Sequence, residues 1–204
     1  MKKRIAVGGS AADPPHLGHL ALLEQLLNLE EFDQIIWILS GFSDYKNPTV
    51  SPDDRVAMTE LMIPKSWRLK SSVELVIRYD DVYGSNTTTI KWLKKLQKQF
   101  PQADLVWYTG SDSIVPRQEY DGRCEIEAFW HCGRELMSDW QFLIVSRQGY
   151  AKPDNLPANF NLLDVKLPDI ASSHIRKLIT GGKKFDHLVT KEVAEYIKKH
   201  QLYN

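Results

Sequence analysis

Short apolar runs alternate with longer amphipathic segments along most of the chain. Runs rich in Ile, Val and Leu, bounded by Gly, Pro or polar residues, are typical of buried strands. They predict strands at residues 4–8, 34–39, 104–109, 140–146 and 160–165, and another near 67–71. Residues 73–82 fit either a strand or a loop.

The amphipathic segments have the helical spacing of apolar residues. They predict helices at residues 17–30, 52–62, 87–100, 123–137, 172–180 and 190–200. The second of these has a clear start, because Ser51 can cap it and Pro52 suits its first turn. The alternation of strands and helices predicts an α/β fold, a doubly wound parallel sheet of the Rossmann-like kind. Ligands in such sheets bind beyond the carboxyl ends of the strands, where the strand order reverses.

The composition is that of a globular protein, with 43% hydrophobic and 25% charged residues among 204. We expect a single domain spanning residues 1–204. Lys and Arg (26) balance Asp and Glu (26), so the charge gives no reason to expect nucleic acid or a membrane surface as partner. No apolar run is long enough for a signal peptide or a membrane span, so we expect a cytoplasmic protein. The sequence leaves the oligomeric state open.

The two cysteines, Cys124 and Cys132, both fall in the helix expected at residues 123–137. Two cysteines without a second pair predict neither a zinc cage nor a disulfide framework. No cluster of carboxylates suggests a dedicated metal site either.

The first chemical motif is GGSAADPPHLGH at residues 8–19, where a strand runs into glycines and then into a helix carrying His16 and His19. Residues three apart on a helix share a face, and the first turn of a helix offers free N–H groups that suit phosphate. Glycines let the backbone approach a bulky anion closely. The motif therefore predicts a phosphate site formed by Gly8, Gly9, Ser10, His16, Gly18 and His19. A glycine-rich turn with two surface histidines is the alternative.

The second motif is IASSHIR at residues 170–176, at the start of a predicted helix. Ser172 is a candidate N-cap, and hydroxyls with free N–H groups can hold phosphate oxygens. Arg176 lies one turn further on and adds a fork of donors. Ser172, Ser173 and Arg176 thus form a second candidate phosphate site, and a plain capped helix with a solvated arginine is the alternative.

Together these motifs resemble the signature of the His-x-Gly-His nucleotidyltransferases, and most of all the nicotinate-nucleotide adenylyltransferases. The usual family forms are G-G-S/T-F-D-P-x-H-x-G-H and I-S-S-T-x-I-R. The chain departs at Ala11 and Ala12, which replace a single Phe and lengthen the loop by one residue. Ala171 and Ser173 are further substitutions. The resemblance implies that AMP passes from ATP to nicotinic acid mononucleotide, with Mg²⁺ accompanying ATP and with release of pyrophosphate.

Weaker matches to the same family lie between the two motifs. Lys46 follows the second strand, where the family often has a basic residue near the phosphates of ATP, although it could be a surface lysine. Asp112, in GSDSI after a strand, could bind a ribose hydroxyl or cap a helix. The resemblance implies that Thr89, Trp130 and His131 bind the acceptor, with Trp130 stacked on the pyridine ring, and a core tryptophan is the alternative. Arg55, Met58 and Arg147 also match, and we interpret Arg55 and Met58 as structural.

Other acceptors remain open, namely nicotinamide mononucleotide and phosphopantetheine, as does a cytidylyl donor. A catalytically weak nucleotide sensor is the alternative from another class, because Ala11 and Ala12 depart from the family pattern and Thr88 stands where the family has Asp. A dinucleotide-dependent dehydrogenase would need G-x-G-x-x-G after the first strand, which is not present. An aminoacyl-tRNA synthetase would need a tRNA-reading domain, for which 204 residues leave no room.

Overall fold

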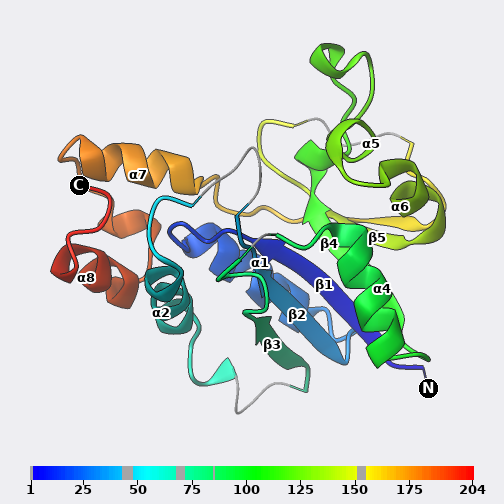
Figure 1. The fold of residues 1–204 in the computed structure, drawn as a ribbon, viewed down its shortest axis with the longest axis horizontal. Coiled ribbons are helices and arrows are strands. Elements are labelled where there is room, and N and C mark those ends of the chain that lie inside the picture. The colour runs from blue at the N-terminus through cyan, green and yellow to red at the C-terminus, as the bar shows by residue number, and fades with distance from the viewer. Residues whose placement is uncertain (1, 43–47, 68–71, 85, 151–154) are drawn as a thin grey trace.

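The computed structural model describes residues 2–42, 48–67, 72–84, 86–150 and 155–204. Its centre is a six-stranded sheet in the order β3-β2-β1-β4-β5-β6, with every neighbouring pair parallel (Figure 1). The strands are β1 (Arg4–Ser10), β2 (Gln34–Leu39), β3 (Glu74–Arg78), β4 (Asp104–Gly110), β5 (Gln141–Val145) and β6 (Phe160–Leu163). The order reverses between β1 and β4, and this places the expected ligand position beside the end of β1. The predicted doubly wound parallel fold is confirmed.

Helices connect the strands and cover both faces of the sheet (Figure 1). They are α1 (Leu17–Asn28), α2 (Pro52–Met62), α4 (Thr89–Gln99), α5 (Glu125–Phe129), α6 (Gly133–Asp139), α7 (Ser172–Thr180) and α8 (Lys191–Lys199). Short 3-10 turns occupy Ser111–Ser113, Gln118–Tyr120 and Asp186–Leu188. The predicted cap of α2 is confirmed, because Ser51 Oγ accepts the backbone N–H of Asp54 at 3.1 Å. None of the helices in the described ranges is long and apolar enough to cross a membrane.

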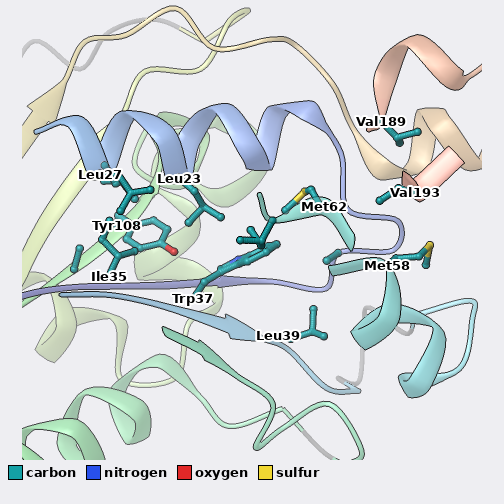
Figure 2. Packing of buried hydrophobic residues seen from close by; sticks show 14 of the residues in the cluster. Leu23, Leu27, Ile35, Trp37, Leu39, Met58, Met62, Tyr108, Val189 and Val193 are labelled. Carbon is teal, nitrogen blue, oxygen red and sulfur yellow. The ribbon is translucent and has the colours of Figure 1, made fainter. Parts of the chain in front are cut away.

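Two separate hydrophobic cores follow from the alternation of side chains along the strands. On β1, Ala6 faces a core formed with α1, α2 and α8, and its neighbours Ile5 and Val7 face a core formed with α4, α5 and α6. Figure 2 shows Leu23 and Leu27 of α1 over the strand residues of the first core. Both faces of the central strands are thereby buried, which explains why their sequences are almost continuously apolar.

The helix predicted at residues 123–137 is wrong, because the structure divides it into α5 and α6. Cys132 adopts a left-handed backbone conformation with φ 57°, which ends helical geometry between the two. Gly133 then lies so close to α5 that an added Cβ would be 2.0 Å from the carbonyl oxygen of Ile126. Both cysteines therefore precede helices rather than share one, and both are free thiols.

Of the two less regular apolar segments, residues 73–82 and residues near 67–71, the structure describes a strand in the first. The ambiguous stretch at residues 73–82 contains β3, the edge strand next to β2. The strand expected near residues 67–71 lies, apart from Trp67, outside the described residues.

Candidate active site

A cavity of about 510 Å³ opens at the carboxyl ends of β1, β4 and β5, facing the first turn of α7. It lies where the strand order reverses, as expected for this kind of sheet. The two sequence motifs, about 150 residues apart, meet across it. The predicted site residues that line it are Gly9, Ser10, His16, Gly18, His19, Asp112, Ser172, Ser173 and Arg176.

The two histidines of the first motif lie face to face, with ring centroids 3.8 Å apart. The predicted helix start at residue 17 is confirmed, so His16 immediately precedes α1 and does not share a helix face with His19 as the motif suggested. The backbone N–H of His16 donates to Nδ1 of His19 at 3.3 Å. Nδ1 of His19 is therefore the unprotonated nitrogen, so that Nε2 carries the proton and donates to Ser10 Oγ at 2.8 Å. Ser10 Oγ also accepts the backbone N–H of Ala12. With both acceptor positions used, the Ser10 hydroxyl can donate its own proton to a ligand.

His16 is buried at the wall of the cavity, with 6% of its surface exposed. Burial, helped by the positive charge of Arg147, lowers its pKa from 6.5 to about 4. The ring is therefore neutral near pH 7. Within the described part of the chain its Nδ1 has no hydrogen-bond partner, although it is buried. A buried polar atom without a partner beside a cavity is suited to a polar ligand.

Glycine allows the close packing on which this arrangement depends. An added Cβ at Gly18 would be 3.0 Å from the His16 ring, so Gly18 gives that ring its place over the helix. An added Cβ at Gly9 would be 2.7 Å from the carbonyl oxygen of Ile38. Gly8 does not line the cavity: its missing side chain makes room for the ring of Tyr108, which a Cβ would approach to 2.3 Å.

The second motif meets the first through direct hydrogen bonds. Ser172 is the first residue of α7 rather than its N-cap, a position held by Ala171, and its hydroxyl donates to the carbonyl of Pro14 at 2.9 Å. Arg176 donates through Nη1 to the carbonyl of Asp13 at 2.6 Å. The prediction that Ser172 caps the helix is therefore wrong, because Ser172 instead ties α7 to the histidine loop.

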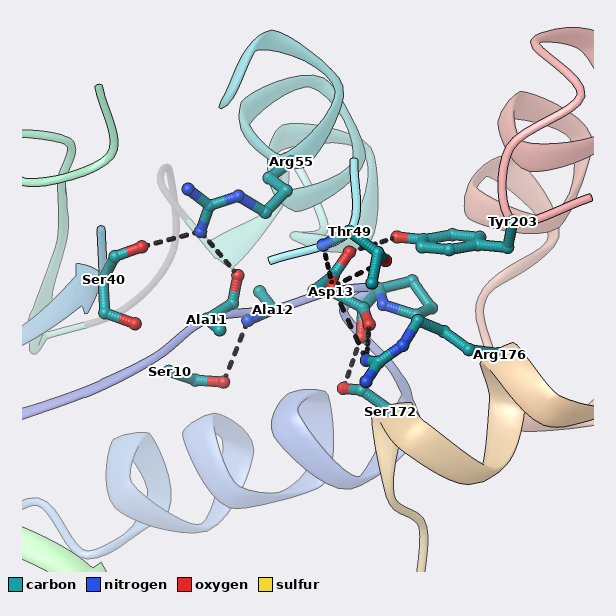
Figure 3. Close-up of polar contacts among 11 residues, drawn as sticks. Ser10, Ala11, Ala12, Asp13, Ser40, Thr49, Arg55, Ser172, Arg176 and Tyr203 are labelled. Atoms are coloured by element: carbon teal, nitrogen blue, oxygen red, sulfur yellow. Dashed lines mark hydrogen bonds and ion pairs between the residues drawn. The ribbon is translucent and has the colours of Figure 1, made fainter. Parts of the chain in front are cut away.

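Asp13 is a site residue that the sequence did not single out. Its carboxylate is 3% exposed and accepts the backbone N–H and the hydroxyl of Thr49, the hydroxyl of Tyr203 and, at 3.5 Å, Arg176 (Figure 3). All of these contacts join Asp13 to segments far away in sequence. Its position within the first motif was the only signal, and its partners could not be inferred from spacing.

Arg55 holds the same loop from the opposite side, which supports the structural interpretation of this residue. It is fully buried and donates to the carbonyls of Ala11 and Ser40 (Figure 3). It also donates to the carbonyl of Val82. These carbonyls belong to the loops that follow β1, β2 and β3, so one side chain fixes three loops at the same edge of the sheet. Ala12, part of the lengthened loop, is buried with φ 47°.

An ion pair forms the wall of the cavity near β4 and β5. Arg147 Nη1 donates to the carboxylate of Asp112 at 2.6 Å, and the backbone N–H of Arg147 donates to Ser111 Oγ. Arg117 donates to the backbone carbonyl of Asp112. The pair thus places a guanidinium beside His16, where its charge acts on the imidazole.

The residues expected to bind the acceptor do not line this cavity. Trp130 is half-buried, packs edge-on against Trp107, and donates to Glu125, a cavity residue, at 3.4 Å. His131 is exposed in the turn between α5 and α6, and Thr89 is the half-buried first residue of α4. Lys46 lies outside the described residues.

Fold and site together define a nucleotidyltransferase: a parallel sheet with histidines and a helix start facing each other across a cavity at its switch point. A family model described as cytidylyltransferase-like matches residues 7–178, and the chain belongs to that family. The predicted enzyme class is confirmed.

Similar proteins match over nearly the whole chain. A probable nicotinate-nucleotide adenylyltransferase of Corynebacterium kroppenstedtii is 30% identical, with 98% of this chain and 90% of that protein covered. A protein of the same description from Dehalococcoides mccartyi is 32% identical, with 96% and 95% covered. The Plasmodium falciparum nicotinic acid mononucleotide adenylyltransferase, solved with NaAD, superposes with a TM-score of 0.80 at 21% identity, with 98% and 97% covered. At that identity the superposition shows a shared fold.

Proposed function

We propose that the protein transfers AMP from ATP to nicotinic acid mononucleotide, forming the deamido-NAD dinucleotide and releasing pyrophosphate. The observation that carries the proposal is the cavity in which His16, His19 and Ser10 face the first turn of α7. The descriptions of the relatives that match nearly the whole chain support the same reaction. The structure of a similar fold holding NaAD, the product expected here, adds support for the dinucleotide.

The triphosphate of ATP would lie between the two motifs. From one side Ser10 and His16 would donate to phosphate oxygens, and His19 would join them by turning its Nε2–H from Ser10 to the phosphate. From the other side the first-turn backbone N–H groups of Ser172 and Ser173 and the guanidinium of Arg176 would donate. Arg176 uses only Nη1 in its contacts with Asp13, so the rest of its fork can face the cavity. Asp112 would bind the ribose, in keeping with its place after a strand of this kind of sheet.

In this arrangement the protein mainly positions the reactants and stabilises charge. The phosphate of the acceptor is already a nucleophile near pH 7, so its attack on the α-phosphorus in line with the leaving pyrophosphate needs no protein base. A neutral His16 would serve as a hydrogen-bond donor rather than a general acid. Gly8 would act indirectly, by leaving space beside β1 for the ring of Tyr108.

Magnesium would enter as part of the ATP substrate. The described residues contain no group of three His, Cys, Asp or Glu side chains that could hold a metal ion by themselves. The donors at the cavity suit phosphate oxygens, and the ion would be bound chiefly by those oxygens and by water. It would neutralise charge on the triphosphate.

The acceptor would bind beside α5 and α6, next to the ends of β4 and β5. Trp130 is linked to the cavity through Glu125, and His131 follows it in an exposed turn. Thr89 at the start of α4 completes the proposed acceptor contacts. Lys46 would bind the phosphates of ATP. We further propose a single domain in the cytoplasm that acts on nucleotides and needs neither nucleic acid nor a membrane.

The experiment measures pyrophosphate release with ATP and Mg²⁺, comparing nicotinic acid mononucleotide with nicotinamide mononucleotide. We expect a strong preference for the acid, seen as a higher kcat/KM. Equal use of both would replace the proposal by a dual-acceptor enzyme. Absence of release with either, while ATP still binds, would contradict it in favour of another phosphorylated acceptor or a nucleotide sensor.

A further inference from the structure

The last residues of the chain reach back to the histidine loop. The hydroxyl of Tyr203 donates to Oδ1 of Asp13 at 2.8 Å, a contact that spans 190 positions (Figure 3). The tail itself is anchored, because Thr180 at the end of α7 donates to the carbonyl of Tyr203 at 3.0 Å and Leu202 N–H donates to Ile197 of α8. The Tyr203–Asp13 hydrogen bond is therefore made by a tail that is fixed to α7 and α8.

Asp13 divides its two oxygens between different partners. Tyr203 binds Oδ1, whereas Thr49 and the guanidinium of Arg176 approach Oδ2. The distance from Oδ2 to Nη1 of Arg176 is 3.5 Å, longer than a good charge-assisted hydrogen bond, and that nitrogen's short contact is to the Asp13 carbonyl. Asp13 thus contacts the guanidinium of Arg176 through Nη1 and leaves its other N–H groups for further contacts.

We propose that Tyr203 is a positioning residue for ATP. Its hydroxyl occupies Oδ1 of Asp13, so that this carboxylate does not form a bidentate ion pair with Arg176. The remaining N–H groups of the Arg176 guanidinium then stay directed at the triphosphate. This inference rests on the proposed function of Arg176.

Each oxygen of a buried carboxylate needs a hydrogen-bond partner. Without the Tyr203 hydroxyl, Oδ1 would be a buried charged acceptor with no partner, which is costly. The nearest cation is Arg176, and two parallel N–H contacts to a carboxylate are its favoured geometry. The Asp13 carboxylate would then rotate toward Arg176 and bind guanidinium N–H groups that otherwise face the cavity. Burial, together with the Asp13 charge, raises the pKa of Tyr203, so the hydroxyl remains a donor throughout the neutral range.

The test compares Tyr203→Phe with Tyr196→Phe in the full-length protein. Each change removes one hydroxyl that binds a carboxylate, but Tyr196 donates to Asp54 on α2, and neither of these two residues lines the cavity. We expect Tyr203→Phe to weaken binding of a non-hydrolysable ATP analogue, measured by calorimetry, roughly tenfold, with a matching rise in the KM for ATP and an unchanged KM for the acceptor. Tyr196→Phe should leave both constants unchanged.

A second measurement separates positioning through Arg176 from general loosening of the fold. In an Arg176→Gln background, Tyr203→Phe should no longer change analogue binding, because the residue through which it acts is absent. Unchanged binding in the Tyr203→Phe single variant, or the same loss in both backgrounds, would overturn the inference. Equal losses in both tyrosine variants would do the same. Since binding is measured without an acceptor, failure of the proposed reaction would show separately, as absent turnover in the wild-type protein.

Discussion

His16 shows how the surroundings of a single residue set its chemistry. An imidazole at a helix start near phosphate suggests a positive charge, yet burial and Arg147 keep this ring neutral. Its neighbour His19 is held in one tautomer by the backbone of His16 and by Ser10. The pair is therefore a set of directed hydrogen bonds prepared before the nucleotide arrives, which suits a reaction that depends on positioning.

The lowered pKa of His16 predicts a stability loss in mild acid. Above pH 6.5 the ring is neutral in both the folded and unfolded states, so it has no effect. Between pH 6.5 and about 4 only the unfolded chain takes up the proton, which lowers the free energy of unfolding by about 3 kcal/mol as the pH falls. Urea unfolding of the wild type and His16→Gln across this range should show that much extra loss in the wild type. Parallel curves would contradict the assigned pKa.

Residue roles were predictable only where the motif itself carried them. His16, His19, Ser10 and Arg176 occur in recognisable patterns, and the structure gathers them at one cavity. Asp13 and Tyr203 could not be paired in advance, because 190 positions separate them and neither spacing nor periodicity links them.

At the scale of elements, the helices predicted at residues 52–62 and 172–180 match α2 and α7 from end to end, whereas the helix predicted at residues 123–137 was wrong. The apolar runs of β1, β2, β4 and β5 were found within a few residues, since burial on both faces leaves a continuous signal. The segment at residues 123–137 has helix-forming composition throughout, and only tertiary contact divides it. The ring of Trp130 packs on Trp107, and Gly133 packs on the backbone of α5.

This contact predicts that Gly133→Ala destabilises the protein. Alanine normally favours a helix over glycine, but here its Cβ would lie 2.0 Å from the Ile126 carbonyl oxygen, so α5 and α6 would have to move apart. We expect a loss of about 1–3 kcal/mol in the free energy of unfolding, measured in urea. The matched control is Gly84→Ala, where an added Cβ meets nothing within 4 Å. A Gly133→Ala variant as stable as this control would show that the helix break does not depend on close packing.

For the whole molecule, the sequence predicted the parallel sheet but not the order of its strands. That order decides which strand ends become neighbours, and it places β1 beside β4. The chain after β6 then returns across the molecule and brings α7 to the histidine loop (Figure 1). Hydrogen bonds of Arg55 and Asp13 then join loops from both halves of the chain around one cavity. The site is thus a property of the topology, although each motif could be found on its own.

Whether this cavity performs adenylyl transfer is best tested with His19→Ala, by measuring pyrophosphate release from ATP and nicotinic acid mononucleotide. His187, an exposed histidine in the turn at Asp186–Leu188, supplies the matched control His187→Ala. We expect kcat/KM to fall at least about 100-fold in His19→Ala, at an unfolding midpoint close to that of the wild type, and to stay unchanged in the control. Near-normal turnover in a folded His19→Ala protein would contradict adenylyl transfer in this cavity.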